Sequence, residues 1–208
     1  TQSTAVDVSA PETTAPAIPS TRGLFTFYVF GYGHGVGMSQ VGANYLAQQG
    51  WTAAEILSHY YYEPNAKIVT GEKYPEKITY NGSRYDTREY LASALESEMG
   101  SSFSYEALKA QAVACYTNAL RLKNENANTQ NHISDDSTVH QGYIDVEQRK
   151  EKWGSDFEKY ETKLKSAVKS VENEALYYND ELCVAAFYAI SCGKTEDAKN
   201  IWGSSVPY

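Results

Sequence analysis

The sequence predicts an α+β fold in a single domain, with helices packed on a mostly antiparallel β-sheet. Three observations support this prediction. The chain has 208 residues, of which 42% are hydrophobic, and this is enough for one sizeable core. Several segments place apolar residues three and four positions apart, as an amphipathic helix does. Short aromatic and β-branched segments lie next to turn residues, which is typical of antiparallel strands.

The first 22 residues differ in composition from the rest of the chain. Fifteen of them are Thr, Ser, Pro or Ala, so this segment has too little apolar surface to offset the entropy cost of ordering it. We expect residues 1–22 to be a disordered stalk between an upstream membrane anchor or signal peptide and a surface domain. The alternative is an artificial tail. On the stalk interpretation the domain, residues 23–208, functions outside the cytoplasm.

The domain is predicted to begin with a strand and to continue into two helices. Leu24–Phe30 is rich in aromatic and β-branched residues. After a glycine-rich loop, apolar spacing predicts a helix that begins at Ser39 and is stopped by Gly50. Thr52–Glu55 has the pattern of a capping box, so we expect a second helix that extends through His59.

The later elements follow from the same signals. Thr87 and Ser104 are candidate N-caps, and Asn81-Gly82 is a turn signal that follows a short apolar segment. The expected elements are, in order, a turn region at 64–75, a strand at 78–80, helices at 88–99 and 105–123, an irregular polar segment at 124–155, a helix at 156–172, a β-hairpin with strands at 175–178 and 181–190, and a loop from 191 to 208.

Charge and hydropathy limit the partners of this chain. Eighteen Lys and Arg against 26 Asp and Glu give a net charge of −8, so binding nucleic acid would bring little counterion release, and we expect no nucleic-acid partner. No apolar run approaches the roughly 20 residues that span a bilayer, so membrane contact is expected only through an anchor upstream of residue 1. Tyr accounts for 18 of the 27 aromatic residues, which suits wet surfaces that stack on sugars.

The cysteines and histidines give no strong metal signal. The three cysteines lack Cys-x-x-Cys spacing, which excludes a disulfide framework and a Cys-rich zinc site. A single Cys183–Cys192 bridge stays open as the alternative to free thiols. One polar segment has metal-ligand residue types without a recognised spacing, so we expect no metal there. Its residues are His132, Asp135, Asp136 and His140.

A histidine among glycines is the first candidate for chemistry. Gly33–Gly37 presents His34 without steric cover, just before a predicted helix N-terminus. Backbone N–H groups at such a position bind anions or sugar hydroxyls. We therefore expect His34, Ser39 and Gln40 to contact a ligand. The alternative is an ordinary turn histidine.

Two carboxyl groups near the end of the helix at 88–99 form the second candidate. Glu96 and Glu98 are two positions apart and therefore face differently, so they are not expected to act as a pair on one sugar. We expect one to point inward and the other to water. A carboxyl near a helix C-terminus meets the negative end of the helix dipole, which raises its pKa in the direction that a general acid requires. The alternative is a solvated helical glutamate.

Three segments together resemble the SpoIID family, that is, stage II sporulation protein D and its amidase-enhancer relatives. They are GHGVGMSQVGA at Gly33–Ala43, YLASALESEMG at Tyr90–Gly100 and EALKAQAVACYTNAL at Glu106–Leu120. Two weaker similarities are HQGY at His140–Tyr143 and the segment Ala185–Tyr208.

The order of these motifs differs from that of the family. In the family the Gly-His-Gly motif lies near the C-terminus, whereas here it comes first. We therefore expect a circularly permuted SpoIID-like domain, in which residues 23–63 correspond to the family's C-terminal part and residues 76–208 to its N-terminal part. In this arrangement Leu24–Phe30 would complete a sheet with the strand Glu181–Ile190.

The resemblance implies a lytic transglycosylase that cleaves the glycan strands of peptidoglycan, with a preference for strands without stem peptides, and leaves 1,6-anhydro-muramic ends. Glu98 occupies the family's Ser-Glu-Met position and is the implied catalytic acid and base, with no metal or cofactor. A cell-wall amidase is an implied further partner, and the implied location is extracytoplasmic, at the cell wall or the outer face of the membrane. The expected substrate-binding residues are His34, Ser39, Gln40, Lys109, Gln111 and Tyr116.

Two departures from the family leave other functions open. Tyr116 stands where the family has an arginine, and the cysteine positions that bind zinc in some members fall on Asp135 and His140. The first alternative is a non-catalytic glycan-binding module that recruits or stimulates an amidase. The second is a structural partner in a cell-surface complex. A role in sporulation, growth or another wall-remodelling process stays open.

Overall fold

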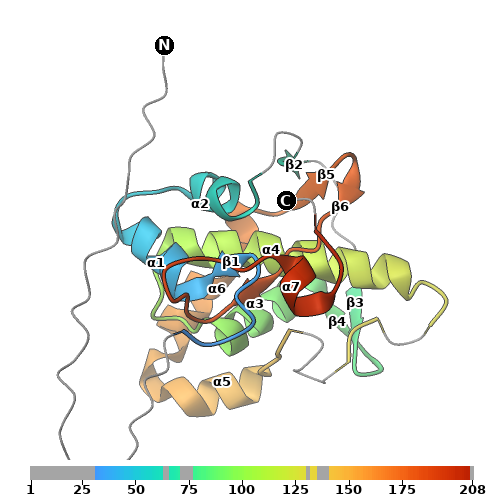
Figure 1. The fold of residues 1–208 in the computed structure, drawn as a ribbon. Coiled ribbons are helices and arrows are strands. Elements are labelled where there is room, and N and C mark those ends of the chain that lie inside the picture. The colour runs from blue at the N-terminus through green and yellow to red at the C-terminus, as the bar shows by residue number, and fades with distance from the viewer. Residues whose placement is uncertain (1–30, 63–65, 71–76, 130–131, 135–140, 207–208) are drawn as a thin grey trace, which may run out of the picture.

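The computed structural model describes residues 31–62, 66–70, 77–129, 132–134 and 141–206 (Figure 1). The expected stalk at residues 1–22 and the expected strand Leu24–Phe30 lie outside these residues, and so does the sheet that this strand was expected to complete.

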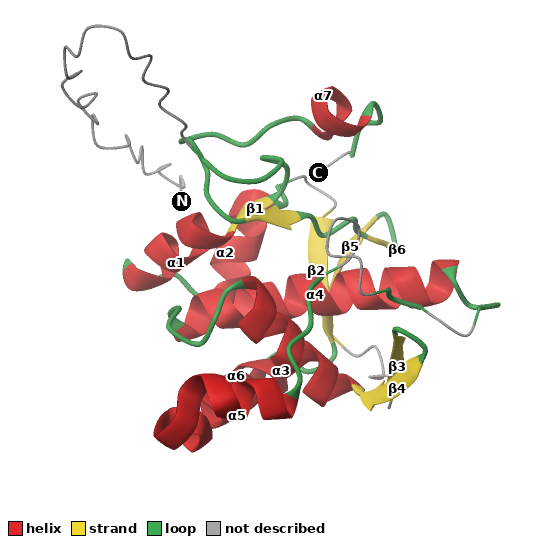
Figure 2. Ribbon diagram, turned by 90° about the horizontal axis from the view of Figure 1, so that it is seen from below, coloured by secondary structure: helices red, strands yellow, loops and turns green. Residues whose placement is uncertain are grey.

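A long helix, α4 (Tyr105–Glu125), forms the centre of the structure, and the other large helices pack against it (Figure 2). Its alanine-rich sequence lets neighbouring backbones approach closely, and most of its side chains from Ala107 to Leu120 are buried. The helices in contact with α4 are α1 (Gln40–Gln48), α2 (Ala53–Tyr60), α3 (Thr87–Glu98) and α6 (Phe157–Ser170).

Local hydrogen bonds explain where the helices begin. Ser39 caps α1, because its Oγ accepts from the backbone N–H of Gly42 at 3.2 Å. The expected capping box of α2 at Thr52–Glu55 is confirmed. For α3 the predicted cap was wrong by one residue, since the carboxylate of Asp86 accepts the first backbone N–H groups and Thr87 already lies in the helix.

The strands form three small sheets in the described part of the chain, where the sequence predicted one mostly antiparallel sheet. The expected strand and turn at Asn81-Gly82 are present as β3 (Lys77–Tyr80), and a second strand that was not predicted, β4 (Ser83–Asp86), completes a hairpin toward the C-terminal end of α4 (Figure 2). A second, antiparallel sheet contains β2 (Ala66–Thr70), β5 (Glu174–Tyr178) and β6 (Glu181–Leu182). In the third, β1 (Met38–Ser39) pairs in parallel with β7 (Phe187–Tyr188).

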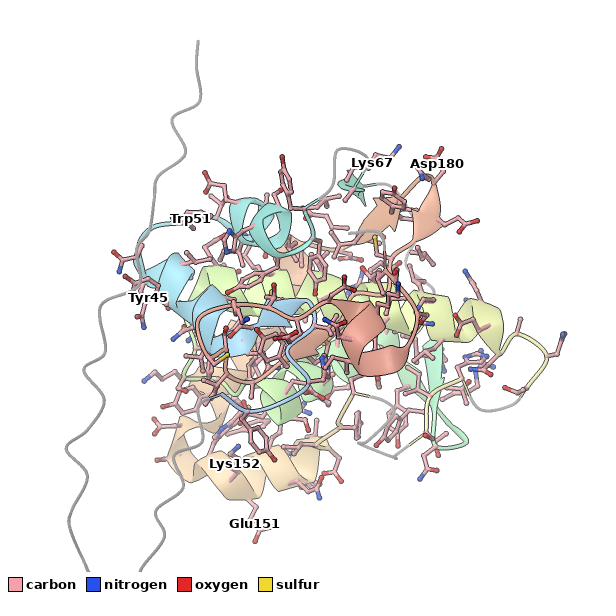
Figure 3. The ribbon with its side chains drawn as sticks, viewed as in Figure 1. Tyr45, Trp51, Lys67, Glu151, Lys152 and Asp180 are labelled. Atoms are coloured by element: carbon pink, nitrogen blue, oxygen red, sulfur yellow. The ribbon has the colours of Figure 1, made fainter. Side chains whose placement is uncertain are left out.

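Three segments expected to be irregular contain regular structure. The turn region at 64–75 contains β2, which pairs with β5 and is tied to its turn by Lys67 and Asp180 at 2.9 Å (Figure 3). The polar segment at 124–155 contains α5 (Val146–Trp153), which begins with a capping box of Asp145 and Gln148. The C-terminal loop contains α7 (Ala198–Trp202). A short 3₁₀ turn at Gly154–Asp156 joins α5 to α6.

The pairing of β1 with β7 places the glycine-rich loop beside the C-terminal segment. Figure 1 shows these two segments, blue and red, side by side in front of α4, and Tyr32 bridges to Ile190 in the same region. A side chain at Gly37 would place its Cβ 2.0 Å from the carbonyl oxygen of Ala186, so this approach requires glycine.

Within the described residues, none of the helices has both the length and the apolar content that crossing a membrane requires.

Candidate functional site

Glu98 and His34 line the same cavity, which has a volume of about 740 Å³. This volume is in the range of small-ligand pockets. Its walls come from the glycine-rich loop, the ends of α3 and α7, the C-terminal half of α4 and the segment 184–189. The charged and amide side chains that line it are His34, Gln40, Glu98, Asn118, Arg121 and Gln141.

Glu98 is the last residue of α3 and is partly buried. Its Oε1 accepts a hydrogen bond from the backbone N–H of Gly142 at 2.5 Å. Burial raises the pKa of Glu98, while the Gly142 N–H and the Gln40 side chain oppose this change because they stabilise the carboxylate. Desolvation is thus the largest cause of the raised pKa, where the sequence argument had invoked the helix dipole.

Gly142 can approach Glu98 because it has no side chain. A Cβ at this position would lie 2.2 Å from Ser97 Oγ and 3.4 Å from Glu98 Oε1. Any larger residue would therefore push the segment that begins at Gln141 away from the end of α3. The glycine of the His-Gln-Gly-Tyr match thus has a specific task, which is to bring a backbone donor to the carboxyl group.

Gln141 is held beside Glu98 by buried partners. Its Nε2 donates to Tyr90 Oη at 2.8 Å and to the carbonyl oxygen of Cys115 at 3.3 Å. Burial raises the pKa of the Tyr90 phenol, so this group stays protonated at neutral pH. The Gln141 Oε1 atom is buried and has no hydrogen-bond partner among the described residues, which leaves an acceptor at the cavity wall.

His34 uses its ring nitrogens to organise the loop. The backbone N–H of Val36 donates to His34 Nδ1 at 3.1 Å, so the neutral ring carries its proton on Nε2. Burial lowers the pKa of His34, and a hydrogen bond to the Phe187 carbonyl partly offsets this. The ring lies 5.1 Å from the Trp202 ring and 5.8 Å from the Tyr188 ring. The neutral imidazole therefore offers a ring surface to the cavity rather than a charged group.

Gln40 faces the cavity and Ser39 does not. Gln40 is 5% exposed, and its side chain stabilises the ionised form of Glu98, although its Nε2 makes no hydrogen bond of normal length within the described part of the chain. Ser39 is fully buried, and its Oγ accepts from the N–H groups of Gly42 and Ser191, both at 3.2 Å. Ser39 thus joins α1 to the C-terminal segment.

The other three expected substrate-binding residues do not line the cavity. Lys109 pairs with Glu106 at 3.0 Å, and Glu106 in turn accepts from the N–H of Ala53 at the start of α2. Gln111 is fully buried and donates to Cys115 Sγ at 3.3 Å. Tyr116 is 1% exposed within the core. In this structure all three support the fold around the site.

Glu96 is 3% exposed, whereas Glu98 is half-buried and lines the cavity. The Glu96 side chain is buried and its Oε1 lies 2.8 Å from Lys152 Nζ on α5. The two carboxyl groups thus point to different sides of α3, as their spacing predicted, and Glu98 is the one at the cavity.

Sequence reasoning missed several residues of the cavity. Asn118 donates to the carbonyl oxygen of Ala185 at 2.8 Å and accepts from its N–H at 3.1 Å, so it holds one wall in place. Arg121 also lines the cavity and lies three residues after Asn118 on α4, about one helical turn later. Their helical spacing of three was a possible signal, but nothing in the sequence indicates which face of α4 meets the segment 184–189. The aromatic lining residues Tyr32, Tyr188 and Trp202 were also not predicted as site residues.

The described residues contain no group of three or more His, Cys, Asp or Glu side chains that could hold a metal ion. Asp135, Asp136 and His140 lie outside these residues. All three cysteines are free, so the alternative of a Cys183–Cys192 bridge was wrong.

Comparison with known proteins finds a family model and several relatives that match part of this chain. Residues 79–178 match SpoIID, the stage II sporulation protein family. Stage II sporulation protein D of Bacillus subtilis is 36% identical over 123 residues, which are 58% of this chain and 36% of that protein. Its counterpart in Bacillus amyloliquefaciens gives the same values.

A further relative, the amidase enhancer of Bacillus subtilis, is 33% identical over 120 residues, which are 57% of this chain and 14% of that protein. The matched part is thus about a third or less of each of these longer proteins. Glu98, Gln141 and the whole of α4 lie inside the matched residues 79–178, whereas the glycine-rich loop and α7 lie outside them. Residues 79–178, just under half of this chain, are thus similar to the SpoIID family.

Proposed function

We propose that this domain is a lytic transglycosylase that cleaves the glycan strands of peptidoglycan, with Glu98 as general acid and base. The similarity of residues 79–178 to the SpoIID family supports a role at the cell wall. The observation that carries the proposal is the Glu98 carboxyl group, which lines a cavity of sugar-binding size and has a pKa raised by burial. A raised pKa keeps a carboxyl group protonated closer to neutral pH, as a general acid requires.

In the first step Glu98 donates its proton to the glycosidic oxygen that links muramic acid C1 to the next sugar. The C1–O bond breaks, the next sugar leaves with a free 4-hydroxyl group, and positive charge develops at C1 and the ring oxygen. Glu98, now ionised, is stabilised by the Gly142 N–H and the Gln40 side chain, the two groups that lower its pKa. These contacts limit the cost of a partly buried carboxylate during the reaction.

In the second step the 6-hydroxyl group of the same muramic acid attacks C1, and Glu98 takes up the hydroxyl proton. A C1–O6 bond forms, the 1,6-anhydro ring closes and Glu98 is again protonated. No water is consumed. Because the nucleophile belongs to the substrate, its effective concentration is high and a second catalytic carboxyl group is not needed. This agrees with a cavity in which Glu98 is the one carboxyl group among the described lining residues.

Digestion of amidase-treated glycan strands, followed by mass spectrometry of the products, tests the proposal. Wild-type protein is expected to produce anhydro-muramic ends, and Glu98→Gln to produce none, because the amide is not acidic enough to transfer a proton to the glycosidic oxygen. Glu96→Gln is the matched control, since Glu96 lies two residues away and does not line the cavity. It is expected to keep the activity. Activity in Glu98→Gln, or none in the folded wild type, would overturn the proposed mechanism.

A second candidate function is a glycan-binding module that recruits or stimulates a cell-wall amidase without cutting the strand. Two observations favour it: Tyr116 replaces the family's arginine, and one relative is named an amidase enhancer. On this proposal, strands bind equally to wild type and Glu98→Gln, and neither makes anhydro ends. Either function places the domain outside the cytoplasm, at the cell wall or the outer face of the membrane.

A further inference from the structure

A fully buried arginine, Arg149 on α5, joins this helix to two other helices and to the segment that precedes it. Its Nε and Nη2 atoms donate to the two carboxylate oxygens of Glu161 on α6, both at 2.9 Å. Nη2 also donates to Glu89 on α3 at 2.5 Å. Nη1 donates to the hydroxyl group of Ser93, which is on α3 as well, and to the carbonyl oxygen of Ile144 at 2.7 Å. All the N–H donors of this guanidinium group are thus used.

The segment 142–144, which carries the donor for Glu98, is held at three successive residues. Gly142 donates its backbone N–H to the Glu98 carboxyl group. The Tyr143 side chain shares a hydrogen bond with that of Ser93. The carbonyl oxygen of Ile144 accepts from the buried guanidinium group. Because Ser93 lies on α3, the helix that ends at Glu98, these contacts fix the position of the backbone donor relative to the carboxyl group.

Stability alone does not account for a buried arginine at this position. Removing two charges from water costs about as much as their attraction returns, so apolar residues in place of Arg149 and Glu161 would often give a fold of similar stability. Apolar residues, however, offer no donor to a backbone carbonyl, and lysine has three donors without the planar fork of arginine. The specific contribution of Arg149 is therefore the geometry that it imposes on its partners.

The charges around Arg149 are balanced without Glu98. Lys165 on α6 lies 3.0 Å from Glu89 and 2.9 Å from Glu161, so two cations face two carboxylates. The pKa of Glu98 responds to burial and to two hydrogen bonds, and the charge of Arg149 is not among its causes. An effect of Arg149 on Glu98 must therefore pass through the segment that carries the backbone donor.

We propose that Arg149 is a positioning residue of the site, which holds the segment 142–144 against α3 and thereby keeps the backbone N–H of Gly142 directed at the Glu98 carboxyl group. The inference rests on the proposed function for the part that Glu98 plays in cleavage. The hydrogen bond itself can be measured without any substrate. The competing explanation is that Gln141, with its own anchors on Tyr90 and the Cys115 carbonyl, is sufficient to place Gly142.

NMR titration from pH 4 to pH 8 tests the inference through two signals. The first is the side-chain carboxyl carbon of Glu98, which is assigned by its absence in Glu98→Gln. The second is the amide proton of Gly142, which should shift as Glu98 ionises, because a hydrogen bond to a charged acceptor is stronger. The other titratable groups that face Glu98 are Tyr90 and Cys115, and burial raises the pKa of both, so both stay neutral over this range.

The main variant is the double substitution Arg149→Met/Glu161→Met. It removes both members of the buried pair, so the net charge is unchanged, and Lys165 keeps Glu89 as its partner. Exchange of a buried ion pair for apolar residues is often tolerated, whereas Arg149→Met alone would leave Glu161 without its main partner. In the double variant we expect Glu98 to titrate at higher pH than in the wild type, and the Gly142 amide signal to lose most of its response.

Two single variants complete the design. Lys165→Gln removes a cation from the same cluster, and among the described residues Lys165 pairs with Glu89 and Glu161 and not with the segment 142–144. It is expected to titrate as the wild type does, even where its stability is lower. Ser93→Ala removes a hydroxyl group that contacts both Arg149 and Tyr143 without changing any charge. It is expected to shift Glu98 in the same direction as the double variant, by a smaller amount.

The inference is overturned if both signals titrate in the folded double variant as they do in the wild type, since the anchors of Gln141 would then place Gly142 by themselves. If the double variant does not fold, Ser93→Ala decides by the same criterion. An equal shift in Lys165→Gln also contradicts the inference. Failure of the proposed cleavage is a separate result: a Glu98 titration that depends on Arg149, in a protein that makes no anhydro ends, supports the positioning role and contradicts the transglycosylase.

Discussion

The backbone N–H of Gly142 donates a hydrogen bond to Oε1 of Glu98, and the two residues are 44 positions apart in the sequence. This contact joins the end of α3 to the segment that carries Gln141. It allows a partly buried carboxyl group to ionise and to be reprotonated, because the donor stabilises the carboxylate while burial stabilises the acid. The balance between these two effects leads to the first two predictions.

Replacement of Gly142 by alanine is expected to lower both stability and activity. The new Cβ would overlap Ser97 Oγ, so the segment must move and the free energy of unfolding should fall by about 1–3 kcal/mol. Loss of the N–H donor would also raise the pKa of Glu98 further. Urea denaturation and cleavage assays measure the two effects.

The double variant Ser97→Ala/Gly142→Ala is the control, because it removes the Oγ atom that the new methyl group meets. It should recover part of the lost stability. If Gly142→Ala alone is as stable and as active as the wild type, Gly142 has no role in placing the donor.

Cleavage is expected to fall as the pH rises through the pKa of Glu98, at a higher pH than for an ordinary glutamate. The same raised pKa affects stability. The folded protein binds the Glu98 proton more tightly than the unfolded chain does, and this difference stabilises the fold. The stabilisation is fully present below the pKa of Glu98 in the unfolded chain and is lost as the pH rises through its pKa in the folded protein. Glu98→Gln should therefore gain stability relative to the wild type over this pH range.

Thermal unfolding of the two proteins from pH 4 to pH 8 measures this difference. A constant difference in unfolding free energy would show that Glu98 does not titrate with a raised pKa. Gln40→Met should move the alkaline limb of the cleavage profile to higher pH, because it removes a group that stabilises the carboxylate.

The circular permutation is a proposal that a rearranged chain can test. We expect a chain that begins near Pro75, ends near Tyr62 and joins Tyr208 to Gly23 through a flexible linker to fold with the same cavity. The pairing of Met38–Ser39 with Phe187–Tyr188 supports this, because it places the glycine-rich loop beside the C-terminal segment. Circular dichroism and glycan binding check it, and an insoluble or unfolded product would count against this order of segments.

Local signals predicted much of the fold. The capping box at Thr52–Glu55 and the turn at Asn81-Gly82 depend on hydrogen bonds within a few residues, and both were predicted correctly. The capping box of α5 is equally local and was overlooked in a polar segment. The side chain of Arg149 in α5 is fully buried and pairs with Glu161 at 2.9 Å and with Glu89 at 2.5 Å. Hydropathy gives no warning of such burial, because it requires partners from other helices.

The sequence by itself determined where the main helices begin, that Glu96 and Glu98 face different ways, and which family the motifs resemble. Only the tertiary structure decided that Glu98 is the carboxyl group at the cavity, that Gly142 supplies its donor and that Arg121 lines the same space, whereas Gln111 and Tyr116 are buried in the core. The physical reason is the range of the interactions. Caps and helical spacing depend on neighbours within four residues, but this cavity forms where segments more than 100 residues apart meet, as at Tyr32 and Ile190.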